Sequence, residues 1–320
     1  MRLNQTSVTA IVVNYNTGYL LHEALDALAL SAQGIALKTV IVDNASKDDS
    51  AALMRRDFAQ HQLVFNANNV GFGRANNQAI PFFHGDYVLL LNTDAFVQPE
   101  TLVDTLAYMQ AHPRCGVLGV QLVGRDGAWQ PSARYFPTPW NLFLQASGLA
   151  RWFPGTRLVD DAQWHYDSPQ LCDWVPGCYY LVRREVVDAV GLFDPRYFLY
   201  YEEVDHCFAV KKAGWDVVCY PHSRVVHIGG ESAKSDGAIT HSGRQLQGLQ
   251  VESEQLYFRK NHGLPSLLAA VLLTLLADLL NAGKCLLGRR PKERAATYLA
   301  HARVHLSTLW RTRLGRQATR

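Results

Sequence analysis

The amino-acid sequence predicts an α/β protein with a parallel, Rossmann-like sheet. Between residues 9 and 94, short apolar segments rich in β-branched residues alternate with segments of helical periodicity. Three of the apolar segments end in Asn14, Asp43 and Asn92. Because parallel strands end at the same edge of a sheet, we expect these polar residues along one edge, where α/β proteins bind their ligands.

Each expected element follows from its local pattern. The N-terminal part predicts strands at 9–13, 38–42, 63–66 and 87–91, with helices at 19–32, 50–61 and 71–80. Residues 121–170 are rich in Pro, Trp and Arg and predict loops. The remaining part predicts extended segments at 172–182, 217–220 and 223–228, helices at 184–190, 202–213 and 251–261, and a loop at 232–242.

The strand expected at 87–91 lies at the centre of the predicted site. Its five consecutive apolar residues suit a strand that is buried on both faces of a parallel sheet. The apolar run stops at Asn92, Thr93 and Asp94, so a carboxylate stands where ligands bind in such sheets. The alternative is that Asp94 only caps the helix that follows it.

The composition limits the partners and the compartment. The chain of 320 residues suits one large or two modest domains, and its net charge of +3 is too small to indicate a nucleic-acid partner. Basic residues are concentrated in 289–320, which favours an anionic surface. The six cysteines show no Cys-x-x-Cys spacing and residues 1–7 do not form a cleavable signal, so we expect a cytoplasmic protein.

The segment 264–287 is apolar but is interrupted by Asp278, Asn281 and Lys284. A spanning helix needs about 20 apolar residues with few charges, and a charge inside a bilayer is costly. We therefore expect an amphipathic helix at a membrane surface, with a spanning or re-entrant segment and an ordinary packed helix as alternatives. The predicted domains are a catalytic domain at 1–262 and a hydrophobic and basic helical extension at 263–320.

Two nucleotide-binding motifs are excluded. The Gly71-Phe72-Gly73 sequence follows the third strand, and Asn76 occupies the place of the third glycine in a dinucleotide fingerprint. We therefore expect no nicotinamide cofactor. No Gly-x4-Gly-Lys-Ser/Thr sequence occurs, which excludes a P-loop.

Three chemical features remain to be explained together: Asp94, the acidic cluster at 202–205 and His227 at the end of a later strand. Each has an ordinary structural interpretation, because acidic residues favour a helix N-terminus and a histidine in an apolar strand is usually a core residue. Together they suggest group transfer from a nucleotide. Asp94 and His227 suit a divalent ion whose coordination a diphosphate completes, and Glu203 or a neighbour is a candidate general base.

Nine motifs, which occur in order, carry a family resemblance. They are Val12–Asn16, Val42–Ser46, Asn68–Asn77, Leu90–Asp94, Trp174–Gly177, Phe193–Asp194, Tyr201–Asp205, Lys212–Trp215 and Val226–His227. From Thr9 to Gly263 the chain resembles the family 2 inverting glycosyltransferases of GT-A fold, in particular their rhamnosyltransferase-like branch. The resemblance implies a Rossmann-like nucleotide-diphospho-sugar transferase fold.

The resemblance also implies a role for each matching residue. Glu203 is expected to be the catalytic base, although the family motif has Asp there, and Asp94 and His227 to bind Mg²⁺ or Mn²⁺. Asn92 replaces the first aspartate of the family's Asp-x-Asp motif, which removes one charge. The residues expected to contact the nucleotide or donor sugar are Val13, Asn14, Tyr15, Asp43, Arg74, Asn77, Asn92, Thr93 and Asp94. Those expected on the acceptor side are Glu202, Asp205, Trp174, Arg259, Lys260 and His262.

The implied reaction inverts the anomeric centre of a sugar as it passes from a nucleotide to a hydroxyl group. The branch suggests a dTDP-rhamnose donor, while a UDP-sugar, another hexose or galactofuranose is the alternative. The expected acceptor is a glycan or a polyprenyl-diphosphate-linked saccharide at the cytoplasmic face of a membrane. A nucleotidyltransferase is a different-class alternative, but the glycine-rich loop with Arg and Lys after the first strand is missing. An inactive GT-A scaffold is the other, which the presence of Asp94, Glu203 and His227 opposes.

Overall fold

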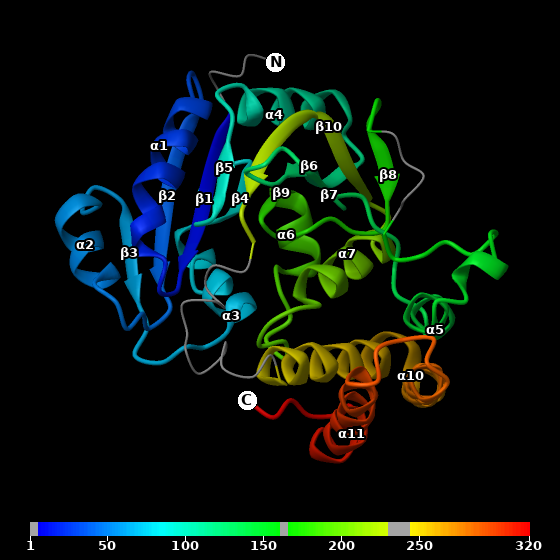
Figure 1. The fold of residues 1–320 in the computed structure, drawn as a ribbon. Coiled ribbons are helices and arrows are strands. Elements are labelled where there is room, and N and C mark those ends of the chain that lie inside the picture. The colour runs from blue at the N-terminus through cyan, green and yellow to red at the C-terminus, as the bar shows by residue number, and fades with distance from the viewer. Residues whose placement is uncertain (1–5, 161–165, 230–243) are drawn as a thin grey trace. The chain divides into compact units, whose positions relative to one another are not determined.

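The structure, a computed structural model, describes residues 6–160, 166–229 and 244–320 (Figure 1). The chain packs as two compact units. Unit 1 comprises residues 1–134, 162–195 and 202–242, and unit 2 comprises 135–161, 196–201 and 243–320. The loop expected at 232–242 lies outside the described residues. The division into a catalytic domain at 1–262 and an extension at 263–320 stays a prediction.

Unit 1 is built on a mixed sheet, whereas the sequence pattern suggested a parallel one. Its parallel part consists of β3 (Gln62–Phe65), β2 (Ala36–Asp43), β1 (Ser7–Asn14) and β4 (Tyr87–Asn92), in this spatial order. The antiparallel β9 (Tyr179–Arg183) then lies between β4 and β6 (Cys115–Val123), and it is followed by β10 (Asp216–His227) and β5 (Ala95–Val97). Two short strands, β7 (Trp129–Gln130) and β8 (Gln170–Cys172), pair with β6 and β10.

The register confirms the predicted polar edge. Asn14 lies opposite Asp43 in the β1–β2 pair, and Val13 lies opposite Asn92 in the β1–β4 pair. The three strands are parallel, so their carboxyl ends meet at one edge of the sheet. The sequence that follows each strand therefore forms one continuous polar border.

Helices cover the sheet of unit 1. One core cluster joins α1 (Leu21–Ser31) and α4 (Thr101–Ala111) to alternate residues of β1 and β4, as expected for side chains that share one face of a sheet. Helix α3 (Phe72–Asn77) contacts β1, α6 (Arg184–Val190) contacts β9, and α7 (Glu202–Lys212) contacts β6 and β10. The remaining elements are η2 (Gly18–Leu20), α2 (Ser50–Asp57) and η3 (Ile80–Phe82).

Four local predictions differ from the structure. Residues 121–170 were expected to be loops, but the helix α5 (Pro139–Ser147) forms there, begun by a capping box of Thr138 and Asn141. Residues 172–182 do not form one strand, because a loop that contains Pro176 and Gly177 separates β8 from β9. The two extended segments expected at 217–220 and 223–228 form one strand, β10, which ends at His227 and has a register shift between Tyr220 and Arg224. Asp94 does not cap a helix, since β5 directly follows it.

Unit 2 is helical. It contains α5 (Pro139–Ser147), η4 (Ala150–Trp152), α10 (Arg244–Leu286) and α11 (Arg294–Arg311), and α10 contacts both α5 and α11 (Figure 1). Gly263 interrupts α10 with φ 81° and ψ 178°, a backbone conformation that favours glycine, and Pro265 follows the break. This kink divides α10 into two helical halves. The predicted helical region after the core is confirmed.

Candidate active site

A chain of side-chain hydrogen bonds runs along the polar edge of the sheet. Asn14 Nδ2 donates to Asp43 Oδ1 at 3.0 Å, and Thr17 Oγ1 donates to Asn14 Oδ1 at 3.0 Å. The Thr17 hydroxyl lies 2.8 Å from the Thr93 hydroxyl, which therefore serves as the donor to Thr17. Asp43 Oδ2 also accepts from the backbone N–H of Ser46 at 3.2 Å. The carboxyl ends of β2, β1 and β4 are thus joined by one buried polar network.

The predicted donor-contact residues Arg74 and Asn77 hold a loop of unit 1. Arg74 Nε donates to the Pro195 carbonyl at 2.6 Å. Asn77 forms two bonds with the Phe193 backbone, donating at 2.6 Å and accepting at 3.1 Å. These contacts position residues 193–195. Contacts of Arg74 and Asn77 with a donor stay a prediction, as do those of Val13 and Tyr15.

Asp94 and His227 face one another. His227 is the last residue of β10, which pairs with β5 so that His227 lies opposite Ala95. Its Nε2 lies 3.7 Å from Asp94 Oδ1. Asp94 Oδ2 accepts from the Gly229 backbone N–H at 3.1 Å, and the Asp94 carbonyl accepts from Ile228 at 3.1 Å. The chain after β10 therefore fixes the orientation of the carboxylate.

Gln130 determines the tautomer of His227. Its Nε2 donates to the His227 carbonyl at 2.9 Å, which leaves its Oε1 to accept from Nδ1–H of the ring at 3.1 Å. The other ring nitrogen, Nε2, then carries a lone pair on the side of Asp94. Burial lowers the pKa of His227 and so favours the neutral imidazole. The Asp94 carboxylate has the smaller, opposite effect on this pKa.

The donor set of Asp94 and His227 fits a divalent cation. A neutral imidazole nitrogen and a carboxylate oxygen are both acceptors, and a histidine ligand commonly donates its other N–H to a neighbour, as His227 does to Gln130. In the described part of the chain, no group of three or more His, Cys, Asp or Glu side chains could hold a metal. A cation at this pair therefore needs further ligands from a bound molecule, and phosphate oxygens are suitable ones.

Glu202 and Glu203 begin α7; Glu202 is buried, Glu203 is half-buried, and the Oε2 atom of each is buried. Neither Oε2 atom forms a hydrogen bond within the described structure. Burial raises the pKa of Glu203, while the Arg134 guanidinium acts in the opposite direction. Burial, followed by repulsion from Glu203, raises the pKa of Glu202 well above its usual range. Glu202 is therefore the carboxyl group that stays protonated longer, and Glu203 is the better candidate for a base.

Arg134 pairs with Trp174 and acts electrostatically on Glu203. The Arg134 guanidinium stacks over the buried Trp174 ring at 4.8 Å, and the two backbones form an isolated β-bridge. A Cβ atom added to Gly177, in the loop between β8 and β9, would lie 4.0 Å from the Glu203 Cβ, which is an ordinary contact distance. This loop therefore approaches Glu203 at Gly177 and pairs with Arg134 at Trp174.

Cys178 connects the two parts of the site. Burial raises the pKa of its thiol to about 12, and the Asp94 and Glu203 carboxylates add to this effect. Both carboxylates are therefore within electrostatic reach of one side chain. The Cys178 carbonyl accepts from the Asn92 backbone N–H at 3.0 Å, and Asn92 Oδ1 is buried and accepts no hydrogen bond within the described structure. The structure thus brings the predicted metal ligands and the predicted base to the same end of β4 and β9.

The remaining acceptor-side predictions are divided between the two units. Trp174, Glu202 and Asp205 are buried in unit 1. Arg259, Lys260 and His262 belong to unit 2, where His262 lies 3.4 Å from the Tyr257 hydroxyl. Acceptor binding by any of these six residues stays a prediction.

Sequence reasoning missed Thr17, Gln130 and Arg134 as parts of the site. Thr17 lies three residues after the polar strand end at Asn14, a spacing that suggests a local hydrogen bond. Gln130 lies in the short strand β7, and Arg134 follows it in the segment rich in Pro, Trp and Arg. No periodicity in that segment indicates which side chains turn toward Glu203 or His227.

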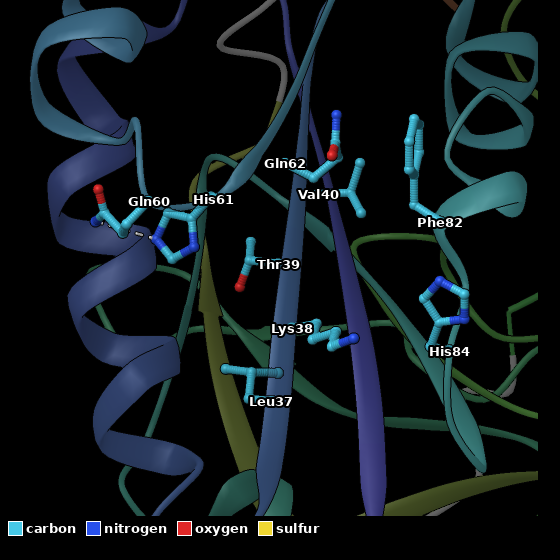
Figure 2. Close-up of a pocket in the computed structure, with 9 residues that line it drawn as sticks. All are labelled: Leu37, Lys38, Thr39, Val40, Gln60, His61, Gln62, Phe82 and His84. Atoms are coloured by element: carbon cyan, nitrogen blue, oxygen red, sulfur yellow. Dashed lines mark hydrogen bonds between the residues drawn. The ribbon is translucent and has the colours of Figure 1, made fainter.

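A separate cavity of about 410 Å³ lies on unit 1 (Figure 2). It is lined by Leu37, Lys38, Thr39, Val40, Gln60, His61, Gln62, Phe82 and His84. These residues include the first half of β2, whereas Asp43 lies at the end of that strand. The cavity contains none of the predicted site residues.

Comparison with known proteins agrees with this geometry. Residues 5–248 match the sequence model of the family described as "Glycosyltransferase like family 2". The N-acetylglucosaminyl-diphospho-decaprenol L-rhamnosyltransferase of Mycobacterium tuberculosis is 28% identical over 254 residues, which cover 71% of this chain and 78% of that protein. Rhamnosyltransferase WbbL of Escherichia coli is 25% identical over 194 residues, which cover 57% of this chain and 70% of WbbL.

The fold is similar to that of solved transferases. The mannosyltransferase PcManGT from Pyrobaculum calidifontis, solved in complex with GDP-Man and Mn²⁺, superposes with a TM-score of 0.55 and 19% identity. The superposition covers 95% of this chain and 87% of that one. Identity at this level supports the GT-A fold of the chain and does not assign its substrates.

Proposed function

Since this chain belongs to glycosyltransferase family 2, we propose that it is a metal-dependent inverting transferase that moves a sugar from a nucleoside diphosphate to a saccharide hydroxyl. The observation that carries the proposal is the Asp94–His227 pair, whose facing acceptor atoms lie 3.7 Å apart at the carboxyl edge of the sheet. Glu203, the candidate base, lies within reach of the same Cys178 thiol as Asp94. A metal site beside a base is the arrangement that such a displacement requires.

The proposed donor is dTDP-L-rhamnose. The two rhamnosyltransferase relatives support this choice, and another hexose or galactofuranose donor, including a UDP-sugar, is the second candidate. The name of the mycobacterial relative gives its acceptor as a polyprenyl-diphosphate-linked N-acetylglucosamine. By analogy, we place the acceptor here among lipid-linked saccharides of cell-surface polysaccharide synthesis. The described cysteines are all free and buried, which suits the reducing cytoplasm where nucleotide sugars are available.

The mechanism is a single displacement with inversion. The Glu203 carboxylate accepts the proton of the acceptor hydroxyl while the oxygen attacks the anomeric carbon. The bond from that carbon to the diphosphate oxygen breaks on the opposite face, and its electron pair leaves with the nucleoside diphosphate. Arg134 favours the ionised form of Glu203. A divalent cation held by Asp94 and His227 would act as a Lewis acid that stabilises the charge of the departing diphosphate.

The test compares Glu203→Gln with Glu185→Gln. Glu185 is an exposed acid in the first turn of α6, so it matches the position of Glu203 in α7 without its burial. With dTDP-rhamnose and a polyprenyl-diphosphate sugar, we expect Glu203→Gln to slow transfer by about 10²–10⁴-fold and Glu185→Gln to leave it unchanged. Thermal unfolding with and without donor shows whether the donor still binds.

Three results would contradict the proposal. A Glu203→Gln variant that transfers at the wild-type rate would remove the residue from the base role. Release of pyrophosphate from dTTP and a sugar 1-phosphate, without sugar transfer from dTDP-rhamnose, would identify a nucleotidyltransferase. An inactive scaffold would bind the donor with no product in any variant.

A further inference from the structure

The second half of α10 has an exposed face without a polar side chain. Between Pro265 and Leu287, all of the exposed residues are apolar. The exposed leucines of this face are Leu268, Leu272, Leu276, Leu279, Leu280, Leu286 and Leu287, with exposed fractions from 38% to 77%. Their spacing of three, four or seven residues places them on one side of a helix. A continuous apolar surface of this kind indicates a binding face.

The polar residues of the same helix point into unit 2. Asp278 Oδ2 lies 2.8 Å from His301 Nδ1 of α11 and accepts a hydrogen bond from it. Asn281 donates to the Ala146 carbonyl at 2.9 Å, and Lys284 donates to the Ser147 carbonyl at 2.6 Å, both at the end of α5. The helix therefore has its exposed leucines on one side and its hydrogen-bonded polar groups on the side that faces α5 and α11.

A cluster of cations stands at the C-terminal end of the leucine face. Lys284 Nζ donates to the Ser147 carbonyl at 2.6 Å, and a Cβ atom added to the neighbouring Gly148 would lie 3.6 Å from the Arg290 guanidinium, so both cations lie at the end of α5, shortly before Arg151 in the chain. The charges of Arg290, Arg151 and Arg289 also lower the pKa of Lys284, after the effect of burial. Arg151 and Arg289 are exposed. Arg151 stacks on the exposed Trp152 at 5.4 Å. An apolar face that is bordered by a tryptophan and arginines is typical of a helix that lies along an anionic membrane surface.

We propose that unit 2 binds flat on an anionic phospholipid bilayer through this leucine face of α10 (Leu268–Leu287), with Arg151 and Arg289 at the phosphate level. The helix has the length and hydropathy of a spanning segment, with a mean hydropathy of 2.0. Spanning would separate Asp278, Asn281 and Lys284 from their partners in α11 and α5 and expose them to hydrocarbon. Binding along the surface keeps these contacts and buries the leucines.

A bilayer fits this face better than a second copy of the chain. In a symmetric dimer whose two-fold axis passes near the C-terminal end of the leucine face, Arg151 and Arg289 of one copy would meet the same arginines of the other copy and repel them. An anionic lipid surface attracts them, by an amount equivalent to about fivefold in affinity for each basic residue. The inference does not rest on the proposed sugar transfer, since membrane binding is measured without donor or acceptor.

The test is flotation of the full-length protein with phosphatidylcholine vesicles, with and without phosphatidylglycerol. We expect binding that requires phosphatidylglycerol and weakens in high salt. Leu272→Ser and Leu279→Ser are each expected to weaken binding by about tenfold, because each removes a largely exposed leucine from the acyl region. The matched control is Leu30→Ser, an exposed leucine of α1 in unit 1, which is expected to bind like the wild type.

A second pair of variants tests the cations. Arg289→Gln is expected to weaken binding to phosphatidylglycerol vesicles by about fivefold, while Arg114→Gln, an exposed arginine of unit 1, has no effect. Circular dichroism confirms that each variant is folded.

Three outcomes would overturn the inference. Protein that stays with the vesicles after alkaline carbonate treatment would indicate a spanning helix. A dimer in solution that Leu272→Ser dissociates, without vesicle binding, would assign the face to a second copy. Equal flotation of the leucine variants and the wild type would remove the leucine face from membrane binding.

Discussion

Replacing Gln130 tests whether His227 is a metal ligand. Gln130→Leu removes the bond to His227 Nδ1 at 3.1 Å and the bond to the His227 carbonyl at 2.9 Å. The ring then loses the contact that keeps its Nε2 lone pair toward Asp94. Each bond contributes about 0.5–1.5 kcal/mol, so the two together correspond to roughly 1–3 kcal/mol. This agrees with the 10–100-fold that partners of metal ligands typically contribute.

The assay is the Mn²⁺ dependence of turnover. We expect Gln130→Leu to raise the Mn²⁺ concentration for half-maximal activity by about 10–100-fold, with a smaller effect on the rate at saturating metal. Gln130→Glu keeps an acceptor for Nδ1–H of His227. We expect its Mn²⁺ concentration for half-maximal activity to lie between those of the wild type and Gln130→Leu. The control is Gln62→Leu, because among the described residues the side chain of this exposed glutamine on β3 bonds only to the carbonyl of its neighbour Leu63. An unchanged Mn²⁺ dependence in folded Gln130→Leu would refute the tautomer argument.

Three further predictions concern charge and packing. Arg134→Gln removes the cation that lowers the pKa of Glu203, so the acidic limb of the pH–rate profile should move to higher pH, with activity recovered in alkaline buffer; an unmoved limb would exclude this role. Burial raises the pKa of Glu254 from an ordinary 4.5 to about 7. The unfolded chain therefore loses this proton at a lower pH than the folded chain does, so the free energy of unfolding should fall as the pH rises from 4.5 to 7. Glu254→Gln should therefore be more stable than the wild type at pH 8, by up to ~3 kcal/mol, and equal to it near pH 4, as measured by urea unfolding; a constant difference between the two would contradict the assignment. Asn77→Ala breaks both bonds to the Phe193 backbone and should lower the free energy of unfolding by roughly 1–3 kcal/mol, and a change within error would show that the loop is held by other contacts.

The sequence was informative where local pattern determines structure. Asn14, Asp43 and Asn92 were placed on one edge because apolar strands separated by helices are parallel, and parallel strands end together. The direction of β9 was not predictable in this way, since the period of a strand is the same in both directions.

Long-range partners were the harder part of the site. Gln130 meets His227 across 97 residues of sequence, and nothing in the segment around Gln130 indicates that contact. Arg134 reaches Glu203 only because the loop between β8 and β9 pairs with it. For α10, the interruptions at Asp278, Asn281 and Lys284 were visible in the sequence. The helix period predicts that they share a side, but the partners that occupy that side come from α5 and α11.

The hydrogen-bond chain from Thr93 through Thr17 and Asn14 to Asp43 has a consequence for variation among related sequences. Each member fixes the proton direction of the next, so Asn14→Asp would keep the acceptor for the Thr17 hydroxyl but replace the donor to Asp43 and place two carboxylates side by side. Changes at these four positions are therefore tolerated only in matched combinations. An alignment of homologues would show them varying as a set, while the leucines on the outside of α10 would exchange freely with other apolar residues.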